Sequence, residues 1–277
     1  MNGIVINIDP VITSIGGLEL RWYGLAIAMA VVATILITAR QIKRRGIPIE
    51  QIYSVGPWMF VGGLLGARLF HVADHWAYYI SNPFQIWQIQ QGGLAIWGAI
   101  IGGILAATIY SRIKQVSLAR LGDALVPGLL VGLIIGRIGC IINGDAYGGP
   151  TDLPWGFIYT SPDAMIPARL LGVPTHPYPV YDMVWNASIL AVLLRGNRYF
   201  KQEGFTFLTF LSLYSVGRIV LSFVRQENII LGGLQEAQVV GIFVLIFSVA
   251  AMIYRRYKRR LEEAALIIRH HRKEVAK

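Results

Sequence analysis

Long apolar segments recur along the chain. Seven of them come close to the roughly 20 residues that a helix needs to cross the hydrocarbon core of a bilayer, although the third and fifth are slightly short. They are residues 22–39, 52–70, 93–110, 124–142, 179–194, 205–224 and 237–254. Periodicity does not separate a short buried helix from a membrane span, so the flanking charges must decide. The pattern favours an all-α polytopic membrane protein with seven transmembrane helices.

Basic residues gather in alternate connections between these segments. Nineteen of the 25 Lys and Arg residues follow the first, third, fifth and seventh segments, nine of them in the tail at 255–277. The positive-inside rule makes that side cytoplasmic, which predicts an N-terminus outside and a C-terminus inside. The basic tail fits an amphipathic helix on the inner surface or a plain solvated helix.

Composition supports one integral membrane domain over residues 1–277. The chain is 55% hydrophobic and 14% charged, whereas a soluble domain carries about a quarter charged residues. Topology accounts for the net charge of +10, so we expect no nucleic-acid partner. A single cysteine excludes an intrachain disulfide, and no basic region precedes an apolar core at the start, so we expect no cleavable signal peptide. The proline-rich stretch at about 143–178, between the fourth and fifth segments, is expected to be an irregular external loop.

Six basic residues are not explained by topology, and all are arginines: Arg21, Arg68, Arg137, Arg169, Arg218 and Arg225. At 1.5 Å per residue, Arg137 lies roughly 24 Å along its helix from the cytoplasmic start, and Arg218 roughly 21 Å. Arg68 lies roughly 27 Å along the second helix. These depths match the outer headgroups, where Tyr23, Trp97 and Asp182 also begin helices.

Arginine at this depth has three interpretations. Its planar guanidinium fits phosphate oxygens bidentately, and a charge inside a span indicates a functional site. Alternatively the side chains extend to the interface, which is as good an explanation for Arg68 and Arg225. Structural ion pairs are a third option, between Arg68 and Asp74 and between Arg137 and Asp145.

Glycines fall into two groups. Small residues at helical spacing in the second, third and fourth segments predict close helix packing; they are Gly62, Gly63, Gly66, Gly98, Gly102, Gly128, Gly132 and Gly136. Gly144, Gly148 and Gly149 follow the fourth segment instead. There we expect them to permit unusual backbone angles and to present amides to an anion.

The stretch GRIGCIINGDAYG at 136–148 resembles the signature of the bacterial phosphatidylglycerol–prolipoprotein diacylglyceryl transferases. Four further stretches resemble the family's other motifs, in family order. They are IDPVITSIGGLELRWYG (8–24), GGLAIWGAIIGG (92–103), HPYPVYD (176–182) and YSVGRIVLSFVRQ (214–226). The likeness therefore extends from near residue 8 to about residue 254.

The resemblance implies transfer of the diacylglyceryl group of phosphatidylglycerol onto the lipobox cysteine of a prolipoprotein signal peptide. It implies a thioether product, release of glycerol 1-phosphate, a bacterial inner-membrane location and no cofactor or metal. Arg137 matches the arginine that holds the lipid phosphate, and Arg218 matches a second essential arginine. Asn143, Gly148 and Tyr23 also match site positions. We predict catalytic roles for Arg137, Arg218, Asn143 and Asp145, and substrate contacts for Arg137, Tyr23, Gly148, Arg68, Arg225, Trp97, His176 and Asp182.

The chain departs from the family pattern at five positions. Trp97 stands where many members carry a histidine that is a candidate base, and Cys140 stands where asparagine is usual. Asp145 and Asp182 replace glutamates, and Ser222 replaces another. Candidate bases are then Asp145, His71, His75 and His176, of which Asp145 adjoins the signature.

Three other interpretations compete with the transferase. A channel or transporter for an anionic solute needs polarity through the full membrane depth, whereas the inner halves of the fourth and sixth segments are apolar. An inactive lipid-binding relative is compatible with the departures. Cys140 as a nucleophile is disfavoured, because a buried cysteine mostly behaves as a small apolar residue and the reacting thiol belongs to the substrate.

Overall fold

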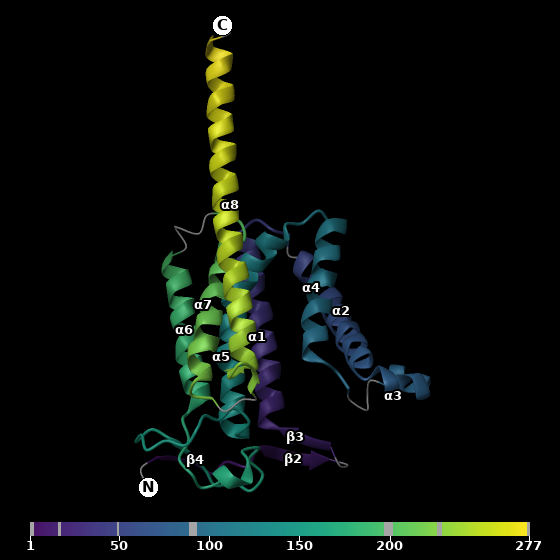
Figure 1. Ribbon diagram of the computed structural model, residues 1–277, viewed down its shortest axis with the longest axis vertical. Coiled ribbons are helices and arrows are strands. Elements are labelled where there is room, and N and C mark those ends of the chain that lie inside the picture. The colour runs from purple at the N-terminus through teal and green to yellow at the C-terminus, as the bar shows by residue number, and fades with distance from the viewer. Residues whose placement is uncertain are drawn as a thin grey trace. The chain divides into compact units, whose positions relative to one another are not determined.

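Helices dominate the computed structural model, which describes residues 3–15, 18–48, 50–88, 93–196, 202–225 and 229–275. Within these ranges, each of the seven predicted apolar segments overlaps one long helix (Figure 1). These helices are α1 (Trp22–Arg44), α2 (Glu50–Asp74), α4 (Ile96–Ile113), α5 (Leu118–Asn143), α6 (Tyr178–Arg195), α7 (Phe205–Ser222) and α8 (Glu236–Val275). The expected mostly helical architecture is confirmed.

Four of these helices, among the described residues, are long and apolar enough to cross a membrane: α1, α5, α7 and the first 30 residues of α8. Large apolar side chains on α8 lie exposed, with Phe243 at 69% and Phe247 at 67%. Such a surface suits lipid rather than water. The chain is a multi-pass membrane protein. Seven crossings and the direction of insertion remain predictions.

The chain forms two compact units, residues 1–38 with 125–277 and residues 39–124. In the first unit, α5, α6 and α7 share an apolar core of Val126, Leu130, Ile189, Leu193 and Phe210. A buried hydrogen bond of 2.8 Å between the Ser212 and Ser248 hydroxyls joins α7 to α8. This core lies toward the ends of α5, α6 and α7 that are opposite Arg137, Asp182 and Arg218.

Short strands and turns cover one end of the first unit. The strands are β1 (Ile4–Ile6), β2 (Val11–Ile15), β3 (Leu18–Arg21), β4 (Phe157–Tyr159), β5 (Ile229–Leu231) and β6 (Leu234–Gln235). They pair as parallel β1–β4 and antiparallel β2–β3 and β5–β6. These strands are absent from the sequence prediction, because runs this short carry no readable alternation.

The loop at 143–178 is mostly irregular, as expected, and a hydrogen bond ties it to α5. It contains β4 and the 3₁₀ turn η3 (Ala168–Leu170). The Tyr159 hydroxyl donates to the Ile141 carbonyl at 3.0 Å. Burial, and then the nearby Asp145 charge, raise the pKa of the Tyr159 phenol, so it remains a hydrogen-bond donor. The loop is thereby fastened to the end of α5.

Glycine packing is confirmed in the second unit. A Cβ on Gly66 would lie 2.3 Å from the Gly98 carbonyl oxygen, and one on Gly102 would lie 2.2 Å from the Gly62 carbonyl oxygen. The backbones of α2 and α4 therefore touch where the glycines face each other. A short helix, α3 (Trp76–Ser81), and the 3₁₀ turn η1 (Pro83–Trp87) follow α2.

The basic tail continues α8 without a break. At 1.5 Å per residue, the 40 residues of α8 make a helix about 60 Å long. Figure 1 shows its yellow end extending well past α6 and α7. The tail is therefore helical, as both alternatives for it required.

Candidate functional site

Arg137 is held by an acid from the neighbouring helix. It lies near the end of α5, and its Nε donates to Asp182 Oδ2 on α6 at 2.6 Å. Both side chains are largely covered, at 17% and 3% exposed. Among the described residues the carboxylate paired with Arg137 is Asp182, so the alternative pairing with Asp145 is wrong. This charge-assisted hydrogen bond orients the Arg137 guanidinium.

Arg218 reaches the same place from α7. Its Nη1 donates to the Tyr178 hydroxyl at 2.6 Å. The adjacent Gly217 lets α6 and α7 approach, because a Cβ there would lie 2.1 Å from Trp185 Nε1. Trp185 in turn donates to the Leu213 carbonyl at 3.0 Å. Residues that are far apart in sequence, Arg137 and Arg218, are thus brought to one face of α6.

Tyr178 is the residue that the sequence analysis missed. It is only 1% exposed and is the first residue of α6. The Arg137 guanidinium carbon lies 5.5 Å from the centre of its ring, and that of Arg225 lies 4.9 Å away. The available signal was its spacing, because Tyr178 precedes Asp182 by four residues and so shares a helix face with it.

Arg225 lies in the segment that follows α7, where its backbone pairs with the loop after α5. Gly148 and Arg225 form an isolated antiparallel bridge, and the Gly148 amide donates to the His176 carbonyl at 3.1 Å. A Cβ on Gly148 would lie 2.6 Å from the His176 Cβ. Three predicted site residues, Gly148, His176 and Arg225, therefore meet at one backbone crossing.

The expectation that loop glycines present amides to an anion is wrong. The amides of Gly144, Gly148 and Gly149 donate to the carbonyls of Cys140, His176 and Val224, at 2.9, 3.1 and 2.8 Å. Gly144 does adopt the expected positive φ, at +75°. These glycines shape and brace the loop, because their donors are already used by the backbone.

Asn143 and Asp145, on either side of Gly144, each have a buried acceptor oxygen without a partner among the described residues. Asn143 is 4% exposed, and its Nδ2 lies 3.2 Å from Met165 Sδ. Asn143 Oδ1 and Asp145 Oδ1 are buried and have no hydrogen-bond partner among the described residues. Leaving a buried acceptor unpaired is costly, so both oxygens are suited to a donor that arrives with a ligand.

Tyr23 and Cys140 lie beside this turn. A Cβ on Gly139 would lie 3.3 Å from Tyr23 Cδ2, so the start of α1 rests on α5 at that glycine. Cys140 is buried and packs with Ala146 and Tyr178. Its Sγ also accepts from Arg137 Nη1 at 3.7 Å, so this buried thiol lies beside the Arg137 guanidinium.

Arg68 and Trp97 belong to the second unit. Arg68 is 6% exposed, and its guanidinium donates to the carbonyls of Ile86 at 2.7 Å, Gly93 at 3.0 Å and Gln85. It therefore binds the chain around η1, while Asp74 approaches His75 Nδ1 at 3.6 Å. Trp97 lies in the first turn of α4 and is half-buried. Their roles as substrate contacts stay predictions.

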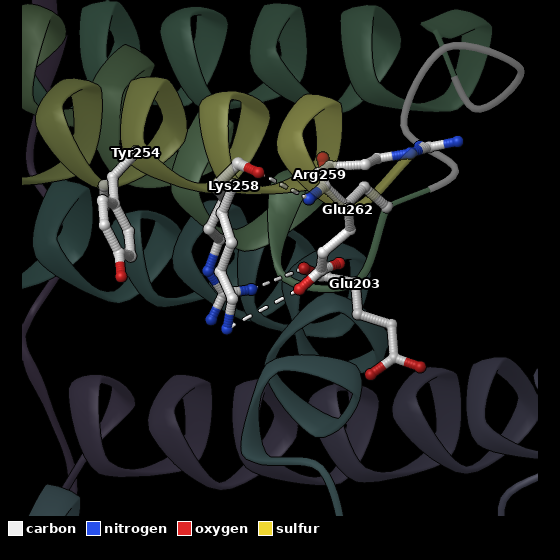
Figure 2. A pocket seen from close by; sticks show the side chains of 8 residues that line it. Glu203, Tyr254, Lys258, Arg259 and Glu262 are labelled. Atoms are coloured by element: carbon white, nitrogen blue, oxygen red, sulfur yellow. Dashed lines mark hydrogen bonds and ion pairs between the residues drawn. The ribbon is translucent and has the colours of Figure 1, made fainter. Parts of the chain in front are cut away.

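A groove of about 760 Å³ lies elsewhere in the first unit, where α8 passes Gln202 and Glu203. Figure 2 shows Lys258, Arg259 and Glu262 along α8, with Glu203 beside them. The charges pair locally, Lys258 with Glu262 at 3.9 Å and Arg259 with Glu263 at 2.8 Å. None of the predicted site residues lines it, so the groove is not the candidate site. Within the described residues no group of three or more His, Cys, Asp or Glu is arranged to hold a metal.

Comparison with known proteins yields a consistent likeness. The sequence model described as "Prolipoprotein diacylglyceryl transferase" matches residues 10–254. Similar proteins named phosphatidylglycerol–prolipoprotein diacylglyceryl transferase include that of Clostridioides difficile strain 630, 34% identical over 91% of this chain and 97% of the relative. Those of Lysinibacillus sphaericus strain C3-41 and Dehalococcoides mccartyi strain BAV1 are 35% and 37% identical, over 93% and 92% of this chain and 96% of each relative.

Proposed function

Because this chain belongs to the prolipoprotein diacylglyceryl transferase family, it transfers the diacylglyceryl group of phosphatidylglycerol to a prolipoprotein, and we propose that it does so at the arginine cluster around the first turn of α6. The cluster consists of Arg137 from α5, Arg218 from α7 and Arg225 from the segment after α7. This transfer is the first step of lipoprotein maturation. The observation that carries the proposal is the convergence of Arg137 and Arg218 on one turn of α6, through Asp182 and Tyr178.

The phosphate of phosphatidylglycerol binds the guanidinium groups in this proposal. Guanidinium donors match phosphate oxygens in geometry and charge. The phosphate diester carries one negative charge, and the departing phosphate monoester carries more. Donors fixed before the reaction stabilise that developing charge without having to reorganise. Arg137 and Arg218 are therefore assigned to the phosphate, with Arg225 beside them.

The bond changes follow from the two substrates. The thiol sulfur of the lipobox cysteine bonds to the glyceryl carbon that carries the phosphate ester. The carbon–oxygen bond breaks, its electron pair goes to the phosphate oxygen, and glycerol 1-phosphate leaves. We assign the thiol proton to Asp145, whose Oδ1 lacks a partner among the described residues. The Asn143 oxygen, in the same condition, accepts from a hydroxyl of the glycerol headgroup.

Membrane topology is proposed along with the site. Seven crossings with the N-terminus outside and the C-terminus in the cytoplasm place the loop at 143–178, and the arginine cluster, at the outer leaflet of a bacterial inner membrane. Prolipoproteins and phosphatidylglycerol meet in that bilayer. The basic residues at 40–45, 112–120, 195–201 and 255–277 support this direction.

The test is a transfer assay with purified protein, phosphatidylglycerol and a lipobox peptide, read by the peptide's mass. We expect a gain of one diacylglyceryl group with the native chain, and no gain with Arg137→Ala. Arg169→Ala is the matched control, because Arg169 lies exposed on η3 of the same loop and should leave turnover unchanged. Full turnover by folded Arg137→Ala protein would show that the phosphate does not bind there.

A further inference from the structure

One buried phenol contacts all three arginines of the cluster. Its hydroxyl accepts from Arg218, and its ring lies under or beside the guanidinium groups of Arg137 and Arg225. These cations come from α5, α7 and the segment after α7. Tyr178 is thus the one side chain of the described cluster that touches every proposed phosphate ligand.

The two kinds of contact are physically distinct. A hydroxyl oxygen accepts a hydrogen bond along a definite direction, so it fixes where Arg218 Nη1 points. The face of an aromatic ring carries negative charge density and attracts cations within about 6 Å of its centre. The guanidinium groups of Arg137 and Arg225 gather around one ring, and like charges repel one another, so an attractive partner between them opposes their separation.

The backbone before α6 holds the phenol in place. Pro177 precedes Tyr178 and Pro179 follows it, which restricts the backbone on both sides. The Tyr178 amide donates to the His176 carbonyl at 2.8 Å. Asp182 lies one helical turn further on, so the first turn of α6 presents a phenol and a carboxylate on one face.

We infer that Tyr178 is a positioning residue that sets the spacing of Arg137, Arg218 and Arg225 for the phosphate of phosphatidylglycerol. The inference rests on the proposed function, which assigns these arginines to that phosphate. Tyr178 does not bond to the substrate in this scheme. It acts through the arginines, with its hydroxyl orienting Arg218 and its ring keeping Arg137 and Arg225 together.

Two substitutions separate these contributions. Tyr178→Phe removes the hydroxyl and keeps the ring, whereas Tyr178→Leu removes the ring face and keeps an apolar side chain. We expect kcat/KM for phosphatidylglycerol to fall about tenfold with Phe and about a hundredfold with Leu. The KM for the lipobox peptide should stay unchanged, because the arginines contact the lipid.

Tyr159→Phe is the matched control, since Tyr159 also loses a buried hydroxyl, one that bonds to a backbone carbonyl. It should lower the thermal midpoint but leave kcat/KM per folded molecule unchanged. Rates are scaled to the folded fraction measured by gel filtration. Equal kcat/KM for Tyr178→Phe and the native chain would overturn the role of the hydroxyl, and equal values for Leu and Phe would overturn the role of the ring.

Arg137→Ala in the same assay distinguishes the two levels of the proposal. If Arg137→Ala is inactive while both Tyr178 variants keep native kcat/KM, the positioning role is wrong and the arginine site stands. If Arg137→Ala is active, the arginine site itself is wrong.

Discussion

Asp182→Asn removes one charge from the cluster with the least change in shape. Asparagine keeps a side-chain oxygen that can accept from Arg137 Nε, where the native distance is 2.6 Å. The backbone carbonyl of residue 182 still accepts from Asn186 at 2.9 Å. The substitution therefore tests the carboxylate charge and leaves the α6 backbone intact.

The magnitude follows from the burial of the pair. Asp182 is 3% exposed, so water screens the interaction little. A hydrogen bond to a charged group contributes about 1.5–3 kcal/mol, against about 0.5–1.5 kcal/mol for a neutral one. The difference is about 1–1.5 kcal/mol, which corresponds to about a tenfold lower kcat/KM for phosphatidylglycerol if Arg137 must be oriented for the transition state. A lower thermal midpoint should accompany it, because a buried guanidinium loses its counterion.

The assay is the initial rate of peptide diacylglyceryl transfer over a range of phosphatidylglycerol concentrations. Asp152→Asn, the same change at an exposed position of the loop, should match the native chain. Asp182→Glu should keep most of the activity, because it keeps the charge. If Asp182→Asn lowered the thermal midpoint but kept native kcat/KM, the pair would be structural only and the orienting role would be refuted.

Two further predictions concern the fold. Gly66→Ala in α2 should cost about 1–3 kcal/mol of stability through overpacking, because its Cβ would lie 2.3 Å from the Gly98 oxygen, and it should therefore lower the thermal midpoint of the detergent-solubilised protein. Gly56→Ala in the same helix should leave the midpoint unchanged, because a Cβ there has no atom within 4 Å. Equal midpoints for the two variants would contradict the contact. The direction of insertion can be tested with single cysteines in a Cys140→Ala background. A membrane-impermeant maleimide should label Asp152→Cys in intact cells, and Lys277→Cys only after permeabilisation. The reverse pattern would overturn the proposed direction of insertion.

The helices could be predicted because their signal is local. Each apolar run is long enough to define a helix. The glycines at 62, 66, 98 and 102 predicted close helix packing, and the structure shows that they pack against one another between α2 and α4. The three-residue strands could not be predicted. Ile4–Ile6 pairs with Phe157–Tyr159, which is about 150 residues away, and no local pattern specifies such a partner.

The sequence predicted part of the arginine cluster, but not how its residues pair, and Arg68 and Trp97 belong to the second unit instead. Depth along each helix predicted one level for Arg137, Asp182 and Arg218. The contacts of Arg137 with Asp182 and of Arg218 with Tyr178 place all three around the first turn of α6. Sequence spacing did not say which acid faces Arg137, because that depends on how α5 and α6 are rotated. Tyr178 was missed for a related reason. A tyrosine at the start of a membrane helix is typical of an interfacial anchor, and only the structure shows that its ring contacts Arg137 and Arg225.

The length of α8 has a practical consequence. From Tyr254 to Val275 the helix runs on for about 32 Å at 1.5 Å per residue, without a break. A dye attached near Val275 is thus carried on a stiff stalk whose orientation is set by the same helix that packs against α7. Energy transfer from that dye to labelled lipids gives a molecular ruler, which reports tilt of the membrane bundle without a label anywhere near the arginines.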